Sequence, residues 1–429
     1  MNLFLDRFLN NKSTLAFLIG LCLYGSEAIQ AVFMIPFYKI RLGDKSTTVW
    51  VTLTSSVGLV SFAYSCYYQP MIRELSRHFE FVSVKSIPKN LQKIITDNNK
   101  LGYGILFFSQ VFFLFFFLSR ITFDTLTLLG IVIYLGSLFY KLSAFNNFII
   151  LIGLRQVGDD KKILFYGSIL GLFLSIFFVF FLDHMIGLAI SSFISAFYIF
   201  WLSKKTKDKY ISQIVIFDSE DIILGQKEKS LLLMLNLGGY LKLNTDIIMA
   251  TSLMPDEFSL DYVFWIKVFY MVFSLLSLWT QIRFPFWASN QYKKNKILRE
   301  VNFGVFIFFV VLVFVVIAFA IFKKIDLFYL KNMMDISIFY LIAMAASVFL
   351  AGYTYALDQF LMAKRCYSLI KTAVIISLLA PVLSFLFASV INPISFIFGY
   401  MTIHLLLLVI DFLRIRNLSP YNLININEF

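Results

Sequence analysis

The sequence predicts an all-α polytopic membrane protein with about 12 transmembrane helices, arranged as two six-helix lobes around a central cavity. Three observations support this fold class: the composition, the number of apolar runs, and the placement of basic residues. The 429 residues are 60% hydrophobic and 18% aromatic, and the mean hydropathy is +0.82, which excludes a soluble protein.

Twelve apolar runs each have the roughly 20 residues that a helix needs to cross a bilayer. They cover about residues 15–38, 47–70, 101–119, 126–150, 162–182, 184–202, 230–254, 258–283, 301–322, 336–359, 368–391 and 393–415. The first run follows Asp6 and Arg7 and lacks a small-residue cleavage site, so we predict a span and not a removed signal peptide. Pro381 is expected to kink the eleventh span, and the Gly167/Gly171 pair predicts close helix packing.

Basic residues concentrate in alternate loops. About 26 of the 37 lie in the segments that become cytoplasmic if the N-terminus is inside, and about 7 lie on the other side. Both termini are therefore predicted to be cytoplasmic. The net charge of +12 is explained by this topology, so nucleic acid is not an expected partner.

The two halves of the chain are predicted to be repeats. The expected division is an N-terminal lobe at 1–203, a basic cytoplasmic linker at 204–229, a C-terminal lobe at 230–416 and a cytoplasmic tail at 417–429. An offset of 216 residues superposes one polar stripe, Thr54, Gly58, Ser61 and Ser65, on another, Tyr270, Ser274, Ser277 and Gln281. Six spans per half is an even number, so the two copies share one orientation in the membrane.

Three stretches carry a resemblance to a known family: Tyr64–Ser76 (YSCYYQPMIRELS), Leu243–Pro255 (LNTDIIMATSLMP) and Gln281–Gln291 (QIRFPFWASNQ). With the two six-span halves and the basic linker, they make the chain resemble the polysaccharide transporters of the MOP superfamily, in particular Wzx-type O-antigen flippases. The resemblance covers nearly the whole chain.

This resemblance implies a transporter of lipopolysaccharide biosynthesis and not an enzyme. A flippase of this kind moves undecaprenyl-pyrophosphate-linked oligosaccharide, the O-antigen repeat unit, from the cytoplasmic to the periplasmic leaflet of the bacterial inner membrane by alternating access. Its expected partners are that lipid-linked glycan and the bilayer, with the polysaccharide polymerase and chain-length machinery as further candidates.

Such a substrate requires cations and sugar-binding groups inside the membrane, because its pyrophosphate carries about two negative charges. The candidate substrate-binding residues are Lys141, Lys242, Lys267, Arg283, Tyr270 and Asn236. Two of the lysines have simpler explanations. Lys242 is placed to form an i, i+4 salt bridge with Asp246, and Lys267 is placed to extend toward the periplasmic surface.

Glu27, Asp246 and Asp358 are the candidate ion-coupling residues, through which H⁺ or Na⁺ would drive transport without any other cofactor. A carboxylate in a low-dielectric span favours its neutral form unless it is paired, so each could take up a proton or a cation. Glu27 has alternatives as a hydrogen-bond partner of Ser26 or Gln30. Asp358 has alternatives in simple solvation or in a pair with Lys141.

Other function classes are less consistent with the sequence. A multidrug/cation antiporter of the same superfamily should have an acidic, aromatic cavity in place of the lysines. A polysaccharide polymerase or other membrane enzyme should have a long periplasmic loop. The three histidines, His78, His184 and His404, are scattered, and the three cysteines show no paired spacing, so no metal site is predicted.

Overall fold

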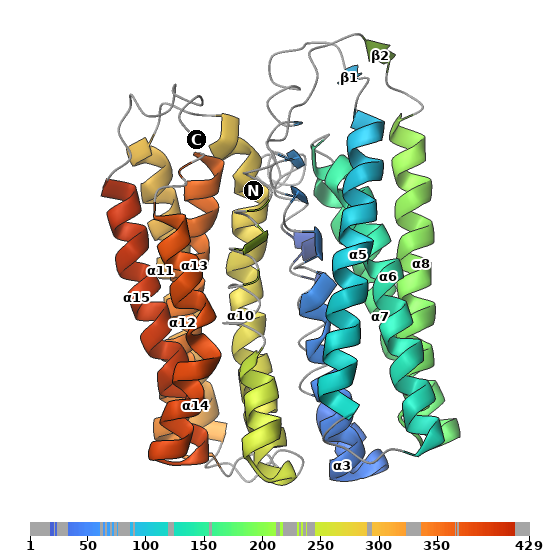
Figure 1. The fold of residues 1–429 in the computed structure, drawn as a ribbon, viewed down its shortest axis with the longest axis vertical. Helices are drawn as coiled ribbons and strands as arrows, with labels where there is room; N and C mark the ends of the chain where they lie inside the picture. The colour runs from blue at the N-terminus through green and yellow to red at the C-terminus, as the bar shows by residue number, and fades with distance from the viewer. Residues whose placement is uncertain are drawn as a thin grey trace, which may run out of the picture. The chain divides into compact units, whose positions relative to one another are not determined.

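Helices account for nearly all of the structure, a computed structural model (Figure 1). It describes residues 18–20, 22–23, 33–60, 63–64, 67–68, 71–72, 75, 86–88, 91–118, 124–153, 157–211, 215–217, 230, 233–234, 237, 245–289, 294–322, 336–364, 366 and 369–416. The long helices are α3 (Ile35–Ser55), α5 (Leu91–Leu118), α6 (Thr125–Gly153), α7 (Val157–Leu182), α8 (Ile186–Ile211), α10 (Asp256–Ser289), α11 (Lys294–Phe322), α12 (Ile338–Ala363) and α15 (Phe396–Arg416).

Within the described ranges, eight helices are long and apolar enough to cross a membrane. They coincide with the predicted spans at 126–150, 162–182, 184–202, 258–283, 301–322, 336–359, 368–391 and 393–415. The predicted spans at 15–38 and 230–254 are described only in part, at 18–20, 22–23 and 33–38 in the first and at 230, 233–234, 237 and 245–254 in the second. A multi-pass helical membrane protein is therefore confirmed.

Packing divides the chain into two compact units. Unit 1 consists of Met1–Ser26 and Ser56–Leu233, and unit 2 of Glu27–Ser55 and Met234–Phe429. The predicted lobes differ from these units chiefly at residues 27–55, because α3 packs on α10. Within α3, Gly43 (φ 77°, ψ 168°) separates two helical segments at the place where the sequence predicts a loop, and a left-handed φ of this kind favours glycine.

In unit 1, α8 packs against both α6 and α7. The predicted close contact at Gly167 is confirmed, since a Cβ there would overlap the side chain of Ile199. The Ser195 hydroxyl donates to the Gly167 carbonyl at 2.7 Å, which fixes the two backbones together. Strands β1 (Ser86–Pro88) and β2 (Val215–Phe217) pair in parallel, with Ile87 opposite Ile216, and so connect the first long predicted cytoplasmic loop to the central linker.

In unit 2, α12 is the central helix and contacts α10, α11 and α15 (Figure 1). The predicted interruption at Pro381 is confirmed: the eleventh span is split into α13 (Ile370–Leu378) and α14 (Ala380–Val390) at Leu379. Proline has no amide hydrogen to continue the helical ladder. A 3₁₀ turn, η3 (Pro393–Ser395), then leads into α15.

Candidate functional site

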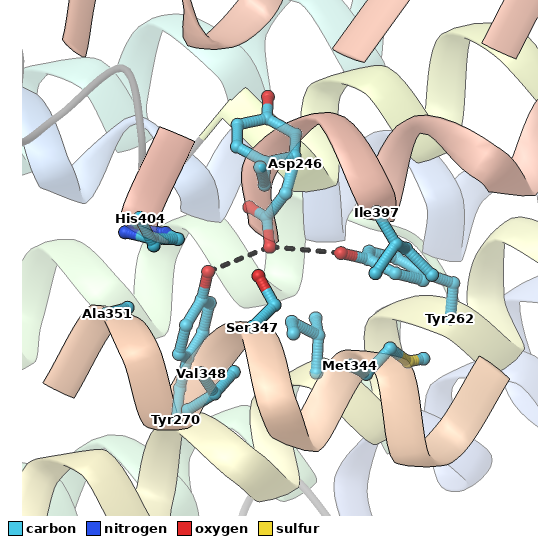
Figure 2. A pocket seen from close by; sticks show the side chains of 11 residues that line it. Asp246, Tyr262, Tyr270, Met344, Ser347, Val348, Ala351, Ile397 and His404 are labelled. Atoms are coloured by element: carbon cyan, nitrogen blue, oxygen red, sulfur yellow. Dashed lines mark hydrogen bonds between the residues drawn. The ribbon is translucent and has the colours of Figure 1, made fainter. Parts of the chain in front are cut away.

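The candidate site is a small cavity inside unit 2 (Figure 2). Helix α10 contributes residues at four-residue steps, and α12 and α15 contribute residues at steps of three and four, so each helix turns one face toward the cavity. The lining residues are Asp246, Tyr262, Ile266, Tyr270, Met344, Ser347, Val348, Ala351, Ile397, Tyr400 and His404.

Asp246 is the only carboxylate among the residues that line this cavity, and it is 3% exposed. Two tyrosines of α10 reach its Oδ2 atom: the Tyr270 hydroxyl donates at 2.8 Å and the Tyr262 hydroxyl at 3.1 Å (Figure 2). The Ile247 amide donates to Oδ1 at 2.8 Å. Among the described residues, no basic side chain forms an ion pair with Asp246, so the carboxylate is held by hydrogen bonds to neutral groups.

A third tyrosine and a histidine complete the polar part of the cavity. Tyr400 and Thr245 are joined by a 2.6 Å hydrogen bond between their hydroxyls, which connects α15 to the helical segment that carries Asp246. His404, one helical turn after Tyr400, is buried. The cavity therefore contains a carboxylate, several hydroxyls and an imidazole, and the oxygen groups are those that hard cations prefer. Within the described residues, no three His, Cys, Asp or Glu side chains form a metal cluster.

Only part of the polar stripe of α10 reaches this cavity. Tyr270 lines it, whereas Gln281 donates to the Ser277 hydroxyl at 3.1 Å, and that hydroxyl lies 3.2 Å from the hydroxyl of Tyr355 on α12. The sequence predicts that the whole stripe lines a wet space. The structure shows that its second half makes hydrogen bonds within α10 and, through Ser277, one to α12.

The predicted cationic residues occupy different environments. Lys141 is half-buried in the middle of α6, with its Nζ atom 5.8 Å from the centre of the Tyr134 ring. Lys267 is half-buried on α10, one turn before Tyr270. Arg283 is ion-paired with Glu300 of α11 at 3.0 Å. Their substrate-binding roles remain predictions, as do those of Lys242 and Asn236, which lie outside the described residues together with Glu27.

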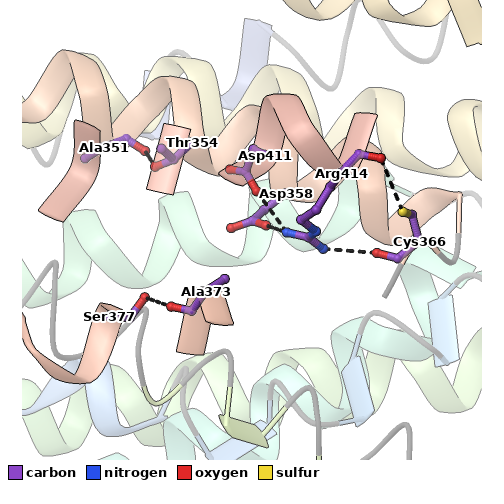
Figure 3. Close-up of polar contacts among 8 residues, drawn as sticks. All are labelled: Ala351, Thr354, Asp358, Cys366, Ala373, Ser377, Asp411 and Arg414. Atoms are coloured by element: carbon purple, nitrogen blue, oxygen red, sulfur yellow. Dashed lines mark hydrogen bonds and ion pairs between the residues drawn. The ribbon is translucent and has the colours of Figure 1, made fainter. Parts of the chain in front are cut away.

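Asp358 belongs to a second buried network, near the ends of α12 and α15 (Figure 3). The Arg414 guanidinium is fully buried and donates to Asp358 at 2.7 Å, to Asp411 at 2.9 Å and to the carbonyl of Cys366 at 3.0 Å. Asp358 is therefore ion-paired, and not simply solvated as one alternative held. The network fixes the ends of α12 and α15 and the turn that follows α12.

Sequence reasoning missed Tyr262, Tyr400, His404 and Arg414. Tyr262 and Tyr270 are eight residues apart, and Tyr400 and His404 are four apart, so each pair lies on one helix face in an otherwise apolar span. That spacing was the available signal. Arg414 lies in the last turn of the last span, where a basic residue is typical of a cytoplasmic helix end, so its sequence position gives no sign of the buried network.

The fold, unlike the sequence, has clear relatives. No protein-family model and no curated protein sequence matches the chain. A mutant of the Vibrio cholerae MATE transporter VcmN superposes with a TM-score of 0.65 at 12% identity, covering 97% of this chain and 100% of that chain. The chain has the fold of MATE transporters.

Two further structures share this MATE fold. An outward-facing multidrug resistance MATE family transporter of the MOP superfamily gives a TM-score of 0.65 at 12% identity, with coverages of 97% and 98%. The eukaryotic MATE transporter AtDTX14 gives 0.62 at 11% identity, with 97% of each chain covered. The predicted all-α, twelve-helix, two-lobe fold class is thereby confirmed, and the fold is that of membrane transporters.

Proposed function

We propose that this chain is an ion-coupled flippase that moves an undecaprenyl-pyrophosphate-linked oligosaccharide from the cytoplasmic to the periplasmic leaflet of the bacterial inner membrane. The MATE fold supports the transport class. The observation that carries the choice of substrate is the presence of Lys141 and Lys267, half-buried within apolar spans of unit 1 and unit 2. A charged side chain inside an apolar span costs free energy, so its presence there usually reflects a function. A pyrophosphate is a suitable ligand for such a cation.

Asp246 is the proposed coupling residue. Its carboxylate is buried and held by two phenol hydroxyls, and it forms no ion pair with a basic side chain in the described part of the chain. An uncompensated buried charge gains most from taking up H⁺ or Na⁺, and moving one charge through 100 mV supplies about 2.3 kcal/mol. Binding and release of that ion would bias the packing of α10, α12 and α15 around the cavity.

The test uses the full-length protein in proteoliposomes with a fluorescent undecaprenyl-pyrophosphate-linked oligosaccharide, whose leaflet is read with an impermeant quencher. Lys141→Gln and Lys267→Gln should each slow flipping by roughly tenfold, the effect of losing one charge-assisted hydrogen bond. Lys205→Gln is the matched control, because Lys205 is exposed at the end of α8 and lies 5.4 Å from the Trp201 ring.

A multidrug/cation antiporter is the second candidate, and one observation favours it. The cavity combines Asp246 with three tyrosines, the acidic and aromatic lining that suits an organic cation. The same vesicles can be loaded with ethidium. Export of ethidium that depends on Asp246, without any flipping of the glycan lipid, would replace the first proposal by the second.

A further inference from the structure

A groove lies on the surface of unit 2 between α11 and α12, separate from the Asp246 cavity. It is lined by Asn302, Val305, Phe306, Phe309, Phe349 and Tyr353. Phe309 and Phe349, which both line it, contact each other edge to face, with ring centres 5.2 Å apart. The lining is thus mainly aromatic and comes from two packed helices of one unit.

The face of α11 that carries this groove is apolar and exposed. Phe306 is 62% exposed, and Phe303 and Phe314, which belong to α11 but do not line the groove, are similarly open. Helix α11 also has the highest mean hydropathy among the described spans. An exposed apolar face within a membrane span meets lipid, so the occupant of the groove should be a hydrocarbon chain.

The groove has a polar end. The Tyr353 hydroxyl donates to the side-chain oxygen of Asn302 at 3.3 Å, and both residues line the groove. Asn302 is eight residues from the first residue of α11, about 12 Å at 1.5 Å per residue. A hydroxyl and an amide at that depth match the ester groups of a glycerolipid, which lie just inside the headgroup layer.

Positive charge lies beyond the polar end. Arg299 is exposed and belongs to the same helix face, since Arg299, Asn302, Phe306 and Phe309 follow steps of three, four and three. The only nearby acid on α11, Glu300, is engaged by Arg283. A second exposed arginine, Arg416, ends α15. Lys294, the first residue of α11, donates from its Nζ atom to the Ile415 carbonyl at 2.8 Å, and this bond joins the end of α15 to the start of α11.

We propose that this groove binds an anionic phospholipid of the cytoplasmic leaflet. One acyl chain packs on Phe306, Phe309 and Phe349, and the phosphate lies near Arg299. From Asn302 to Phe309 the groove runs about 10 Å along α11, within the roughly 15 Å hydrocarbon depth of one leaflet. That length fits part of one acyl chain and is short for a long polyprenyl tail. The site is independent of what the protein transports.

The experiment measures lipid binding to delipidated full-length protein by native mass spectrometry, with dioleoyl phosphatidylglycerol and dioleoyl phosphatidylcholine as probes. The wild-type protein should bind the anionic lipid about fivefold more tightly, as expected for one cation near the membrane surface. Arg299→Gln should abolish this preference. Lys371→Gln is the matched control, because Lys371 is exposed at the start of α13, outside the groove.

Two further variants locate the chain and the ester groups. Phe306→Ala should weaken the binding of both lipids, whereas Phe314→Ala, outside the groove, should weaken the binding of neither. Tyr353→Phe should weaken both by about twofold to fivefold, the effect of one hydrogen bond. Equal preference in Arg299→Gln and Lys371→Gln would overturn the proposal. So would occupation of the groove by undecaprenyl phosphate at concentrations where phosphatidylglycerol is not retained.

Discussion

Unit 2 contains two buried polar clusters that share α12 and α15 but treat negative charge in opposite ways. Near the start of α15, Asp246 is held by the hydroxyls of Tyr262 and Tyr270. About 21 Å along α15 from Tyr400, at 1.5 Å per residue, Arg414 neutralises Asp358 and Asp411. One cluster has a carboxylate without a described counter-charge, and the other has a complete ion network.

This difference separates a responsive site from a structural one. A buried ion network with a guanidinium at its centre has no need of an external cation, so it changes little when ion concentrations change. A buried carboxylate that has only neutral donors responds to H⁺ or Na⁺, because the ion supplies the missing charge. Carboxylates in one unit can therefore differ in role, and the hydrogen-bond partners decide which is which.

The largest predicted effect is the loss of stability when the ion network of Arg414, Asp358 and Asp411 is broken. Arg414→Leu leaves Asp358 and Asp411 buried without their cation, and this should lower the free energy of unfolding by about 3–5 kcal/mol. Thermal unfolding in detergent and the amount of protein in the membrane would measure the loss. Arg416→Leu, an exposed neighbour on the same helix, is the control and should unfold almost as the wild type does. Equal stability of the two variants would refute the structural role.

The second prediction contrasts the two carboxylates directly. Asp246→Asn should reduce ion-driven transport by at least tenfold with little loss of stability, because the amide preserves the shape of the residue and the cavity loses only a charge. Asp358→Asn should do the reverse, lowering the melting temperature while leaving the dependence on ΔpH or Na⁺ intact. Transport by both variants in proteoliposomes, measured with and without the ion gradient, distinguishes the two roles. An unchanged gradient dependence in Asp246→Asn would exclude it as the coupling site.

A smaller effect should follow from the tyrosines. Tyr270→Phe removes the 2.8 Å hydrogen bond to Asp246, and the apparent affinity for the coupling ion should change by about fivefold, the equivalent of one hydrogen bond of about 1 kcal/mol. Tyr355→Phe is the matched control, because Tyr355 contacts Ser277 and does not line the cavity. If both variants shift ion affinity equally, the cavity is not the ion site.

The smallest predicted effect is on the pH dependence of stability, and it comes from Asp124, which lies outside the spans, just before α6. Asp124 accepts from the Thr127 amide at 3.2 Å and lies 3.2 Å from His184; hydrogen bonding to Thr127 is the main cause that holds the pKa of Asp124 below its ordinary value of 3.8. A lowered folded-state pKa stabilises the protein above that value, and the contribution is lost as pH falls through the folded pKa.

Asp124→Asn keeps a capping oxygen but removes the charge. Its melting temperature should therefore be slightly below that of the wild type at neutral pH, and the difference should shrink as the pH falls below 3.8 and through the lowered folded-state pKa of Asp124. Melting curves over this range give the measurement. A difference that persists in acid would show that the charge of Asp124 is not its cause.

The sequence predicts the fold well because its signals are local. Run length, loop charge, Pro381 and Gly167 are all read within a single span or loop, and the structure confirms eight predicted spans among the described residues as well as the helix break and the close contact. The packing of α3 on α10 could not be predicted, since a span can pack on either half without any change in its hydropathy.

The site was only partly predictable, because function here depends on which polar groups meet across helices. The sequence identifies Asp246 and Tyr270 as unusual residues inside spans, but their hydrogen bond joins positions 24 residues apart on separate helices. Asp358 looks equally unusual in sequence, yet Arg414, 56 residues later, removes it from the set of uncompensated charges. Tyr262, Tyr400 and His404 could not be assigned to the site either, because only the packing of the helices brings them to Asp246.

The break between α13 and α14 has a mechanical consequence. Proline at 381 cannot donate to the carbonyl of Ser377, so that turn lacks one of the bonds that resist bending in a continuous rod. Stiffness along the eleventh span is therefore lowest at Leu379. The two pieces can tilt against each other there at smaller elastic cost than an unbroken helix would allow.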